Sequence, residues 1–333
     1  MTEQMTRWQR LRAAVRGEPV DRPPVAFWRH FYEREDTVEG LAEAMVAWTR
    51  TWGWDLLKVN PRASYHVEDW GVRVRFSGQP HLKPTVVDYP VKTPADWARI
   101  EPLPIDQGVL GDHLRALRLI RQALGDEVPF IMTIFTPLSL AGDLVGADAQ
   151  LRRDLQEHPR AVHRALEAIT DTFVRYARAC LAAGASGIFL ATTSWASRNV
   201  LTDAQYQEFG RPYDLQVLAA VAEAPFNVLH VCGENNMLDL LADYPVAAVN
   251  WAATDPSNPC LADGLKLVPG AVMGGVSHAA LLAETPAQVE AEIYEGFRQT
   301  DGRRWIVAGS CSIPTQSRPE NLQAVWRAVT STE

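Results

Sequence analysis

The chain has 333 residues, of which 47% are hydrophobic and 22% are charged, a balance typical of a soluble globular protein with a large core. Its formal net charge of -8 argues against a nucleic-acid-binding or anionic-membrane-binding surface, so small molecules or other proteins are the expected partners. With four cysteines, no N-terminal signal peptide and no apolar run of about 18 residues, the chain is expected to be cytoplasmic, reduced and without a membrane span.

Short apolar runs that favour strands alternate along the chain with amphipathic segments of helical spacing. Alternating strands and helices favour parallel pairing, and eight such units favour a closed barrel. We therefore predict the α/β class, a (β/α)8 TIM-type barrel, and one domain over residues 1–333, because no linker divides the chain. The expected strands are Pro24–Trp28, Leu56–Asn60, Phe130–Phe135, Gly187–Thr192, Asn227–Cys232, Ala247–Trp251, Ala271–Val276 and Trp305–Gly309.

Helices are expected between these strands. The last of these helices has residues typical of a helix start at its N-terminus. Thr285 is the expected cap of that helix and Pro286 lies in its first turn. A much shorter helix, about one turn around Asn235–Leu241, is expected between the fifth and sixth strands. The longer helices are Val38–Thr51, Leu114–Leu124, Ala161–Ala183, Thr202–Ala222 and Pro286–Arg298.

The segment Ala63–Asp88 follows the second expected strand without a helical pattern. Within it, Val72–Phe76 alternates between apolar and basic residues, which is typical of a strand exposed on one face. We predict a small β insertion after the second strand that overhangs the mouth of the barrel.

Three side chains of metal-ligand type stand at the ends of two expected strands. His230 and Cys232 lie two apart in a strand, so they project to the same face, while Val231 faces away. Cys311 follows the apolar run that ends at Gly309, at the carboxyl end of another strand, where TIM barrels carry their active-site groups. Imidazole and thiolate are preferred ligands of Zn²⁺, and three protein ligands with one open position are typical of a catalytic site. We predict that these three residues bind catalytic zinc.

Ordinary packing is the alternative for each of these residues. Taken singly, His230 is read more readily as a hydrogen-bonded core histidine, and Cys232 as a small buried hydrophobe. Their shared position at strand ends, together with the family resemblance given next, favours the metal. Cys180 lies in an alanine-rich helical segment and is expected to pack in the core, and Cys260, in a loop rich in proline and asparagine, is expected to be a stray thiol.

Six motifs are spread over nearly the whole chain: Arg22–Arg29, Phe209–Tyr213, His230–Gly233, Met273–Val276, Gly309–Pro314 and Arg318–Leu322. Together they resemble the uroporphyrinogen decarboxylase superfamily. Within it, the chain is more similar to the zinc methyltransferase branch, the methylcobamide:coenzyme M methyltransferases, whose His-x-Cys and distant cysteine bind zinc. The resemblance implies a TIM-type barrel and a thiol as the methyl acceptor.

Departures from the decarboxylase branch support the choice of the methyltransferase branch. The arginine-rich loop of that branch corresponds here to Arg29–Glu33, which keeps one arginine, and its catalytic aspartate aligns with Asn60. Its C-terminal histidine aligns with Cys311. An uncharged amide cannot pair with pyrrole nitrogens as a carboxylate does, and the loss of a cation weakens the hold on a polycarboxylate substrate.

The predicted activity is a zinc-dependent transfer of a methyl group between a corrinoid, or a similar methyl donor, and a small thiol. A corrinoid-binding Asp-x-His-x-x-Gly motif is missing because Asp112–His113 lacks the glycine, so a separate corrinoid protein is the expected partner. Two alternatives stay open. One is decarboxylation of a porphyrinogen, and the other is a non-catalytic binding protein braced by structural zinc.

Five further residues are candidates for contacts with the substrate or the metal. Arg29 is a candidate for binding a carboxylate or sulfonate on the thiol, with a surface salt bridge as the alternative. Asn60 and Asn250 are candidates for hydrogen bonding at the barrel mouth. Glu234 directly follows the His-x-Cys-Gly turn and is a candidate for the open zinc position until substrate displaces it, with a solvated loop carboxylate as the equal alternative. His278 is a candidate fourth ligand or proton shuttle, although an ordinary loop histidine is the simpler reading.

Overall fold

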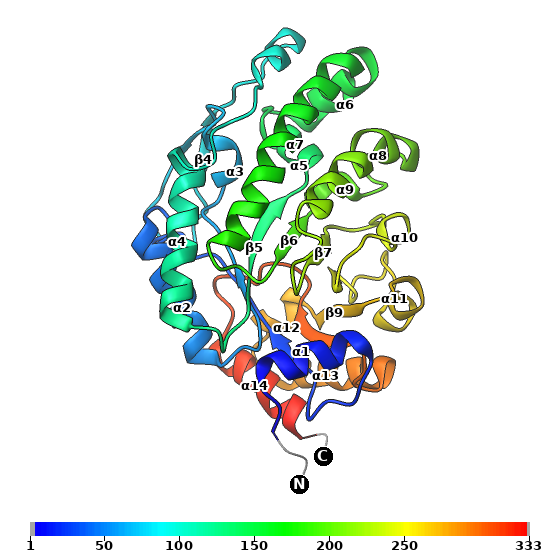
Figure 1. Ribbon diagram of the computed structural model, residues 1–333. Coiled ribbons are helices and arrows are strands. Elements are labelled where there is room, and N and C mark those ends of the chain that lie inside the picture. The colour runs from blue at the N-terminus through cyan, green and yellow to red at the C-terminus, as the bar shows by residue number, and fades with distance from the viewer. Residues whose placement is uncertain (1–3, 332–333) are drawn as a thin grey trace.

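Parallel pairing joins eight strands into one sheet within residues 4–331, the part of the chain that this computed structural model describes (Figure 1). The order β1-β10-β9-β8-β7-β6-β5-β2 wraps the sheet into a nearly closed barrel. Each strand overlaps one of the predicted runs, so the TIM-type barrel is confirmed. The strands are β1 (Val25–Ala26), β2 (Leu57–Val59), β5 (Phe130–Phe135), β6 (Ile188–Ala191), β7 (Val228–Val231), β8 (Ala248–Trp251), β9 (Ala271–Val276) and β10 (Trp305–Gly309).

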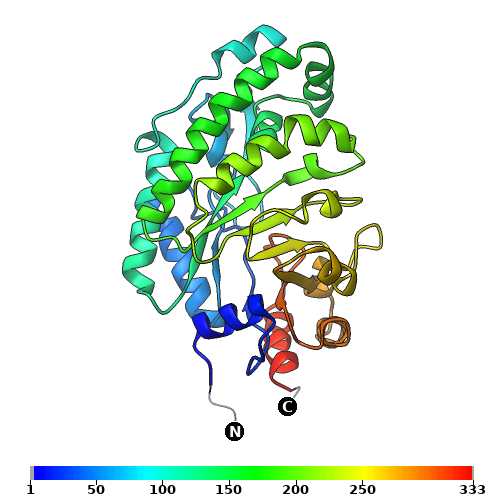
Figure 2. The same ribbon diagram turned by 45° about the vertical axis from the view of Figure 1, so that its right-hand side comes forward.

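Helices surround the strands on the outside of the barrel, as the two views show (Figures 1 and 2). Each long helix buries one apolar stripe against the sheet, as α7 does with Leu166, Ile169 and Phe173. The α-helices are α1 (Arg7–Arg16), α2 (Val38–Trp52), α3 (Tyr65–Glu68), α4 (Gly108–Leu124), α5 (Pro137–Asp143), α6 (Asp148–Glu157), α7 (Pro159–Ala182), α8 (Asp203–Phe209), α9 (Arg211–Ala219), α10 (Leu238–Leu241), α11 (Leu261–Leu267), α12 (His278–Leu282), α13 (Ala287–Thr300) and α14 (Pro319–Thr330). Short 3-10 helices occupy Pro94–Arg99 and Thr193–Ala196. Within residues 4–331, every helix is too short or too polar to cross a bilayer.

Two details of the helix prediction are wrong. The segment Thr202–Ala222 is not one helix, because α8 ends at Phe209 and a second helix, α9, begins at Arg211. Pro212 has no N–H for an uninterrupted helix and is tolerated only in a first turn. Thr285 does not cap α13: the carbonyl of Pro286 accepts the first helical hydrogen bond, from the N–H of Glu290, so Pro286 itself is the cap residue.

Between β2 and β5 the chain forms α3 and an antiparallel pair of strands, β3 (Arg73–Arg75) and β4 (Thr85–Asp88). Side chains from this segment, including Lys83 and Val86, line the pocket at the carboxyl ends of the barrel strands. The segment therefore forms part of the wall of the central pocket.

The inside of the barrel is filled by alternate residues of the strands. In β6, Ile188 and Leu190 pack outward against the helices, whereas Phe189 packs inward. In β7, Leu229 points outward, so the same alternation turns His230 inward. The period of two thus determines which side chains reach the pocket.

Ion pairs and hydrogen bonds to one buried carboxylate join β1 and β2 at the seam of the barrel. No ladder pairs these strands within residues 4–331, but the buried Asp55 carboxylate accepts hydrogen bonds from the Val25 N–H at 2.8 Å, Arg10 Nη1 at 2.6 Å and Arg22 Nη1 at 2.7 Å. Arg10 is 2% exposed and Asp55 is 1% exposed. The ion pairs thus replace part of the missing ladder.

Replacing Asp55 by alanine should destabilise the barrel strongly, because it leaves Arg10 buried beside fewer partners. We expect Asp55→Ala to lower the free energy of unfolding by roughly 3–5 kcal/mol, as measured by urea denaturation. Asp126→Ala is the control, because that carboxylate is fully exposed in its pair with Arg121 and should be silent. A loss for Asp55→Ala below about 1 kcal/mol would show that the seam does not depend on this carboxylate.

Candidate functional site

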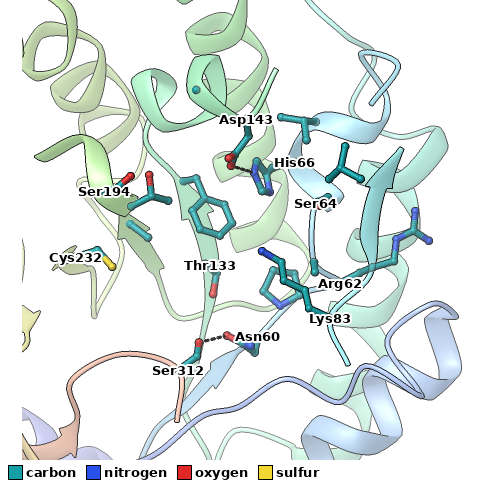
Figure 3. Close-up of a pocket in the computed structure, with 18 of the residues that line it drawn as sticks. Asn60, Arg62, Ser64, His66, Lys83, Thr133, Asp143, Ser194, Cys232 and Ser312 are labelled. Carbon is teal, nitrogen blue, oxygen red and sulfur yellow. Dashed lines mark hydrogen bonds and ion pairs between the residues drawn. The ribbon is translucent and has the colours of Figure 1, made fainter. Parts of the chain in front are cut away.

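A pocket of about 540 Å³ opens at the carboxyl ends of the strands (Figure 3). Its wall and floor come from β2, β5, β6 and β7, from the β3–β4 segment and from the loop that follows β10. Polar and apolar side chains mix there, which is typical of a small-molecule site. The lining residues include Trp28, Lys58, Asn60, His66, Lys83, Phe135, Asp143, Phe189, His230, Cys232, Cys311 and Ser312.

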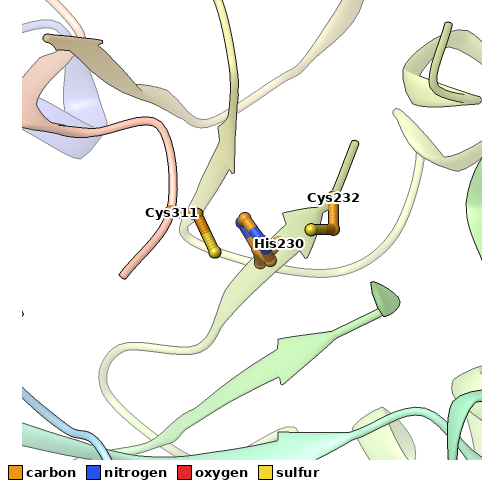
Figure 4. Close-up of side chains that lie close together, drawn as sticks. All are labelled: His230, Cys232 and Cys311. Atoms are coloured by element: carbon orange, nitrogen blue, oxygen red, sulfur yellow. The ribbon is translucent and has the colours of Figure 1, made fainter. Parts of the chain in front are cut away.

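The three predicted metal ligands converge in this pocket (Figure 4). His230 belongs to β7, Cys232 directly follows that strand, and Cys311 comes from the loop after β10. One nitrogen of the imidazole and the two sulfur atoms all lie within 4.8 Å of one another. Among the described residues, no other group of histidine, cysteine and carboxylate side chains meets the same test.

A hydrogen bond to Asn250 orients the imidazole of His230. Asn250 Nδ2 donates to the carbonyls of Met273 at 2.9 Å and Gly309 at 3.1 Å, and carbonyls only accept, so the amide orientation is determined. Its Oδ1 therefore faces His230 Nδ1 at 2.6 Å, and Nδ1 must carry the proton. His230 Nε2 keeps its lone pair and is buried without a hydrogen-bond partner within the described part of the chain.

The two thiols of the three-donor group influence each other's ionisation. The nearby Cys232 thiol lowers the pKa of Cys311 well below its usual range, and His230 and Lys58 lower it further. The nearby Cys311 thiol, together with burial, raises the pKa of Cys232. A dication favours the deprotonated form of both thiols, so metal binding would release their protons. The donor set of two thiols and one free imidazole nitrogen fits Zn²⁺.

The two asparagines predicted at the mouth have different positions. Asn60 lines the pocket and is 1% exposed. Asn250 is fully buried and does not lie at the mouth, because its amide is held by backbone carbonyls and by His230. Its position supports the orientation of an imidazole and not contact with a ligand.

The structure does not bring the other three candidates into the pocket. The Arg29 guanidinium donates to the Thr315 carbonyl at 2.8 Å and lies 4.6 Å from the centre of the Phe31 ring, so its contacts are within the protein. Glu234 is exposed in the loop after Cys232, and the half-buried His278 begins α12. Neither Glu234 nor His278 joins the three-donor group among the described residues.

Lys58 is a pocket residue that the sequence analysis missed. It is 4% exposed, and burial lowers its pKa to about 7. Its Nζ donates to Asn60 Oδ1 and lies 4.8 Å from the ring centre of Phe189 and 5.5 Å from that of Trp28. A lysine inside the apolar run Leu56–Asn60, two positions before Asn60, was the signal that could have revealed it, because residues two apart share a face.

A second missed feature is the pair of His66 and Asp143 on the opposite wall (Figure 3). His66 Nε2 lies 2.7 Å from Asp143 Oδ2, and its ring centre lies 4.2 Å from that of Phe135. The two residues come from α3 and α5, far apart in the chain. Neither has a local sequence pattern that could have predicted the pair.

Comparisons with known proteins agree on one family. The sequence profile described as Uroporphyrinogen decarboxylase (URO-D) matches residues 6–332. The chain is 26% identical to the Methylcobamide:CoM methyltransferase MtbA of Methanosarcina mazei, over 97% of each protein, and 28% identical to the Uroporphyrinogen decarboxylase of Syntrophotalea carbinolica, over 87% of this chain and 88% of that one. A solved methyltransferase from Methanosarcina mazei has a TM-score of 0.84 and 23% identity and covers 98% of this chain and 99% of that one, which shows the shared fold.

The tautomer of His230 can be measured directly. In chelator-treated protein, long-range ¹H–¹⁵N correlation spectra should show neutral His230 protonated at Nδ1, whereas Asn250→Leu should populate both tautomers because the acceptor is lost. His113 is the internal control, since its Nδ1 lies 2.8 Å from the Val109 carbonyl and should stay protonated in both proteins. A wild-type signal from His230 protonated at Nε2 would contradict the assigned orientation.

Proposed function

Because the chain belongs to the uroporphyrinogen decarboxylase (URO-D) family, as its motifs indicated, we propose that it is a zinc-dependent methyltransferase of that family. It moves a methyl group between a corrinoid and a small thiol. The observation that carries the proposal is the convergence of His230, Cys232 and Cys311 within 4.8 Å in the pocket. The full-length similarity to a protein named Methylcobamide:CoM methyltransferase supports the reaction class.

The three donors are proposed to bind one Zn²⁺. When bound, zinc would supply a Lewis acid that favours the thiolate form of a thiol near neutral pH. The chain contributes the orientation of the imidazole through Asn250, and the barrel supplies the apolar surroundings through Phe189, whose ring stacks on His230 with centres 5.3 Å apart. The imidazole of His230 is therefore held both by a hydrogen bond at Nδ1 and by a ring contact with Phe189.

A separate corrinoid protein is proposed as the partner. His113, in the Asp112–His113 sequence, is buried, and both of its ring nitrogens have partners within the protein. Its Nδ1 lies 2.8 Å from the Val109 carbonyl, and its Nε2 accepts from the Arg62 N–H at 3.3 Å. This histidine is therefore engaged and does not offer a corrinoid ligand.

We further propose that the protein is cytoplasmic, that residues 1–333 form one domain, and that the substrate is a small-molecule thiol.

The two alternatives have less support. Porphyrinogen decarboxylation is disfavoured because the pocket presents an amide at Asn60 and because Arg29 is bonded to Thr315, away from the pocket. A closed structural zinc site needs four protein ligands. The three donors are joined by no fourth histidine, cysteine or carboxylate among the described residues, which favours an open position.

Metal analysis separates the proposal from a metal-free decarboxylase. We expect about one zinc per chain in the wild type and a sharp reduction in Cys311→Ala, because one of three ligands is lost. Cys260→Ala is the matched control: that thiol is half-buried and bonded to Asp263, outside the three-donor group. Equal zinc in the wild type and in Cys311→Ala would remove Cys311 from the site.

Methyl transfer is tested with methylcobalamin and a panel of small thiols, with demethylation followed optically. We expect the zinc-loaded wild type and Cys260→Ala to demethylate the corrinoid with at least one thiol, and His230→Ala to lose most of the rate. If fully zinc-loaded protein were inactive with every thiol in both directions, the methyltransferase assignment would have to be abandoned.

A further inference from the structure

A second histidine of the pocket has a nitrogen atom without a partner. His66 lies in α3 and lines the pocket on the wall opposite Cys232 (Figure 3). The residue is 5% exposed, and its Nδ1 is buried without a hydrogen-bond partner within residues 4–331. Buried polar atoms nearly always have a partner in a folded protein, so this nitrogen on a pocket wall indicates a place for a ligand atom.

Asp143 determines which nitrogen of His66 carries the proton. A carboxylate only accepts hydrogen bonds, and Asp143 Oδ2 lies 2.7 Å from His66 Nε2, so Nε2 carries the proton. In the neutral imidazole, Nδ1 then holds a lone pair and only accepts. The two residues come from different helices, α3 and α5, whose packing sets the orientation of the ring. The wall therefore presents one hydrogen-bond acceptor that needs a donor.

A metal ion does not account for this free nitrogen. Among the described residues, His230, Cys232 and Cys311 form the one group of three donors within 4.8 Å, and His66 does not belong to it. A metal site in a protein needs several such ligands. The missing partner of His66 Nδ1 is therefore an O–H or N–H group of a ligand.

Apolar side chains form much of the wall that contains His66. The ring centres of Phe135 and His66 lie 4.2 Å apart. Val67, Val72 and Val145 line the same pocket and are buried, and they come from α3 and from the segments after α3 and α5. An apolar ligand group gains from burial against these side chains, whereas a charged group would lose its hydration. The wall therefore fits a neutral apolar group that carries one donor.

The charged residues that line this part of the pocket are paired or exposed. Arg62 Nε donates to Glu68 Oε1 at 3.0 Å. Lys83 and Asp148 are exposed. A buried charge that would select an ionic ligand is thus not found on this wall among the residues that the structure describes.

We propose that His66 and Asp143 form a subsite for the hydroxyl group of a neutral aromatic ring, whose O–H donates to His66 Nδ1. The ring would pack against Phe135. A thiol of a few carbon atoms fills only part of a pocket of about 540 Å³, so we assign the ring to the body of the thiol substrate. This assignment rests on the proposed function, whereas the hydroxyl subsite does not.

Phenol and anisole test the subsite, because they share a ring and differ in the O–H donor. In NMR titrations of the full-length, zinc-loaded protein, phenol should bind roughly 10-fold more tightly than anisole and should shift the ¹⁵N resonance of His66 Nδ1. His66→Phe keeps a ring but has no acceptor, so the preference for phenol should fall below about twofold. His81→Phe is the control: it removes an exposed imidazole whose Nδ1 lies 3.0 Å from Thr315 Oγ1, and it should leave the preference unchanged.

His66→Leu gives a second variant in case His66→Phe does not fold, and the ¹⁵N measurement needs no variant. We expect the same loss of preference, because leucine also lacks an acceptor. The proposal is overturned if phenol leaves the Nδ1 resonance unchanged, if the wild type binds phenol and anisole equally, or if the His66 variants keep the preference.

A pair of thiols tests whether the thiol carries the ring. With the wild type, 2-(4-hydroxyphenyl)ethanethiol should have a KM at least about fivefold lower than 2-phenylethanethiol, and His66→Phe should reduce the difference below about twofold. Equal KM values in the wild type, beside phenol binding that depends on His66, would reject the thiol as the carrier and support the subsite alone. Phenol binding that depends on His66, in a zinc-loaded protein that transfers no methyl group, would reject the proposed function and still support the subsite.

Discussion

The parallel register between β7 and β8 is the constraint on which the site depends. It sets His230 opposite Asn250, so that the amide can hold the imidazole by Nδ1 and leave Nε2 free. The alternation of β7 then turns Cys232 to the same side as His230. A slip of one residue would turn both side chains toward the helices and remove the donor set from the pocket. The register of the strands thus determines whether the metal-ligand side chains face the pocket.

Buried polar groups have partners at one end of the barrel and lack some of them at the other. At the seam between β1 and β2, the buried Arg10 and Asp55 bond to each other, and these contacts stabilise the closure. In the pocket, Lys58, Asn60 Nδ2 and His230 Nε2 are buried with unmet bonding capacity. Such groups lower the stability of the fold unless a ligand supplies the missing partner. This arrangement is expected of a binding site and not of a core.

Local patterns predicted most of the fold and the central part of the site. The eight strands were predictable because each is a short apolar run that ends before a helical segment, and His230 and Cys232 were predictable because their spacing alone sets a shared face. The position of Asn250 was not, since it depends on the pairing of β8 with β7 and on two carbonyls from other strands. The contact between His66 and Asp143 depends on the packing of α3 and α5 in the same way. Pro212 was a local signal for the break between α8 and α9, but the helical spacing of the apolar residues led to the prediction of one helix.

Zinc K-edge X-ray absorption of the purified protein tests the central claim most directly, because it reports the atoms around the metal and does not need a substrate. The account predicts a first shell with two sulfur atoms at about 2.3 Å and at least one nitrogen at roughly 2.0–2.1 Å. A shell of oxygen and nitrogen alone, with no sulfur contribution, would contradict the account, because it would place the zinc away from Cys232 and Cys311.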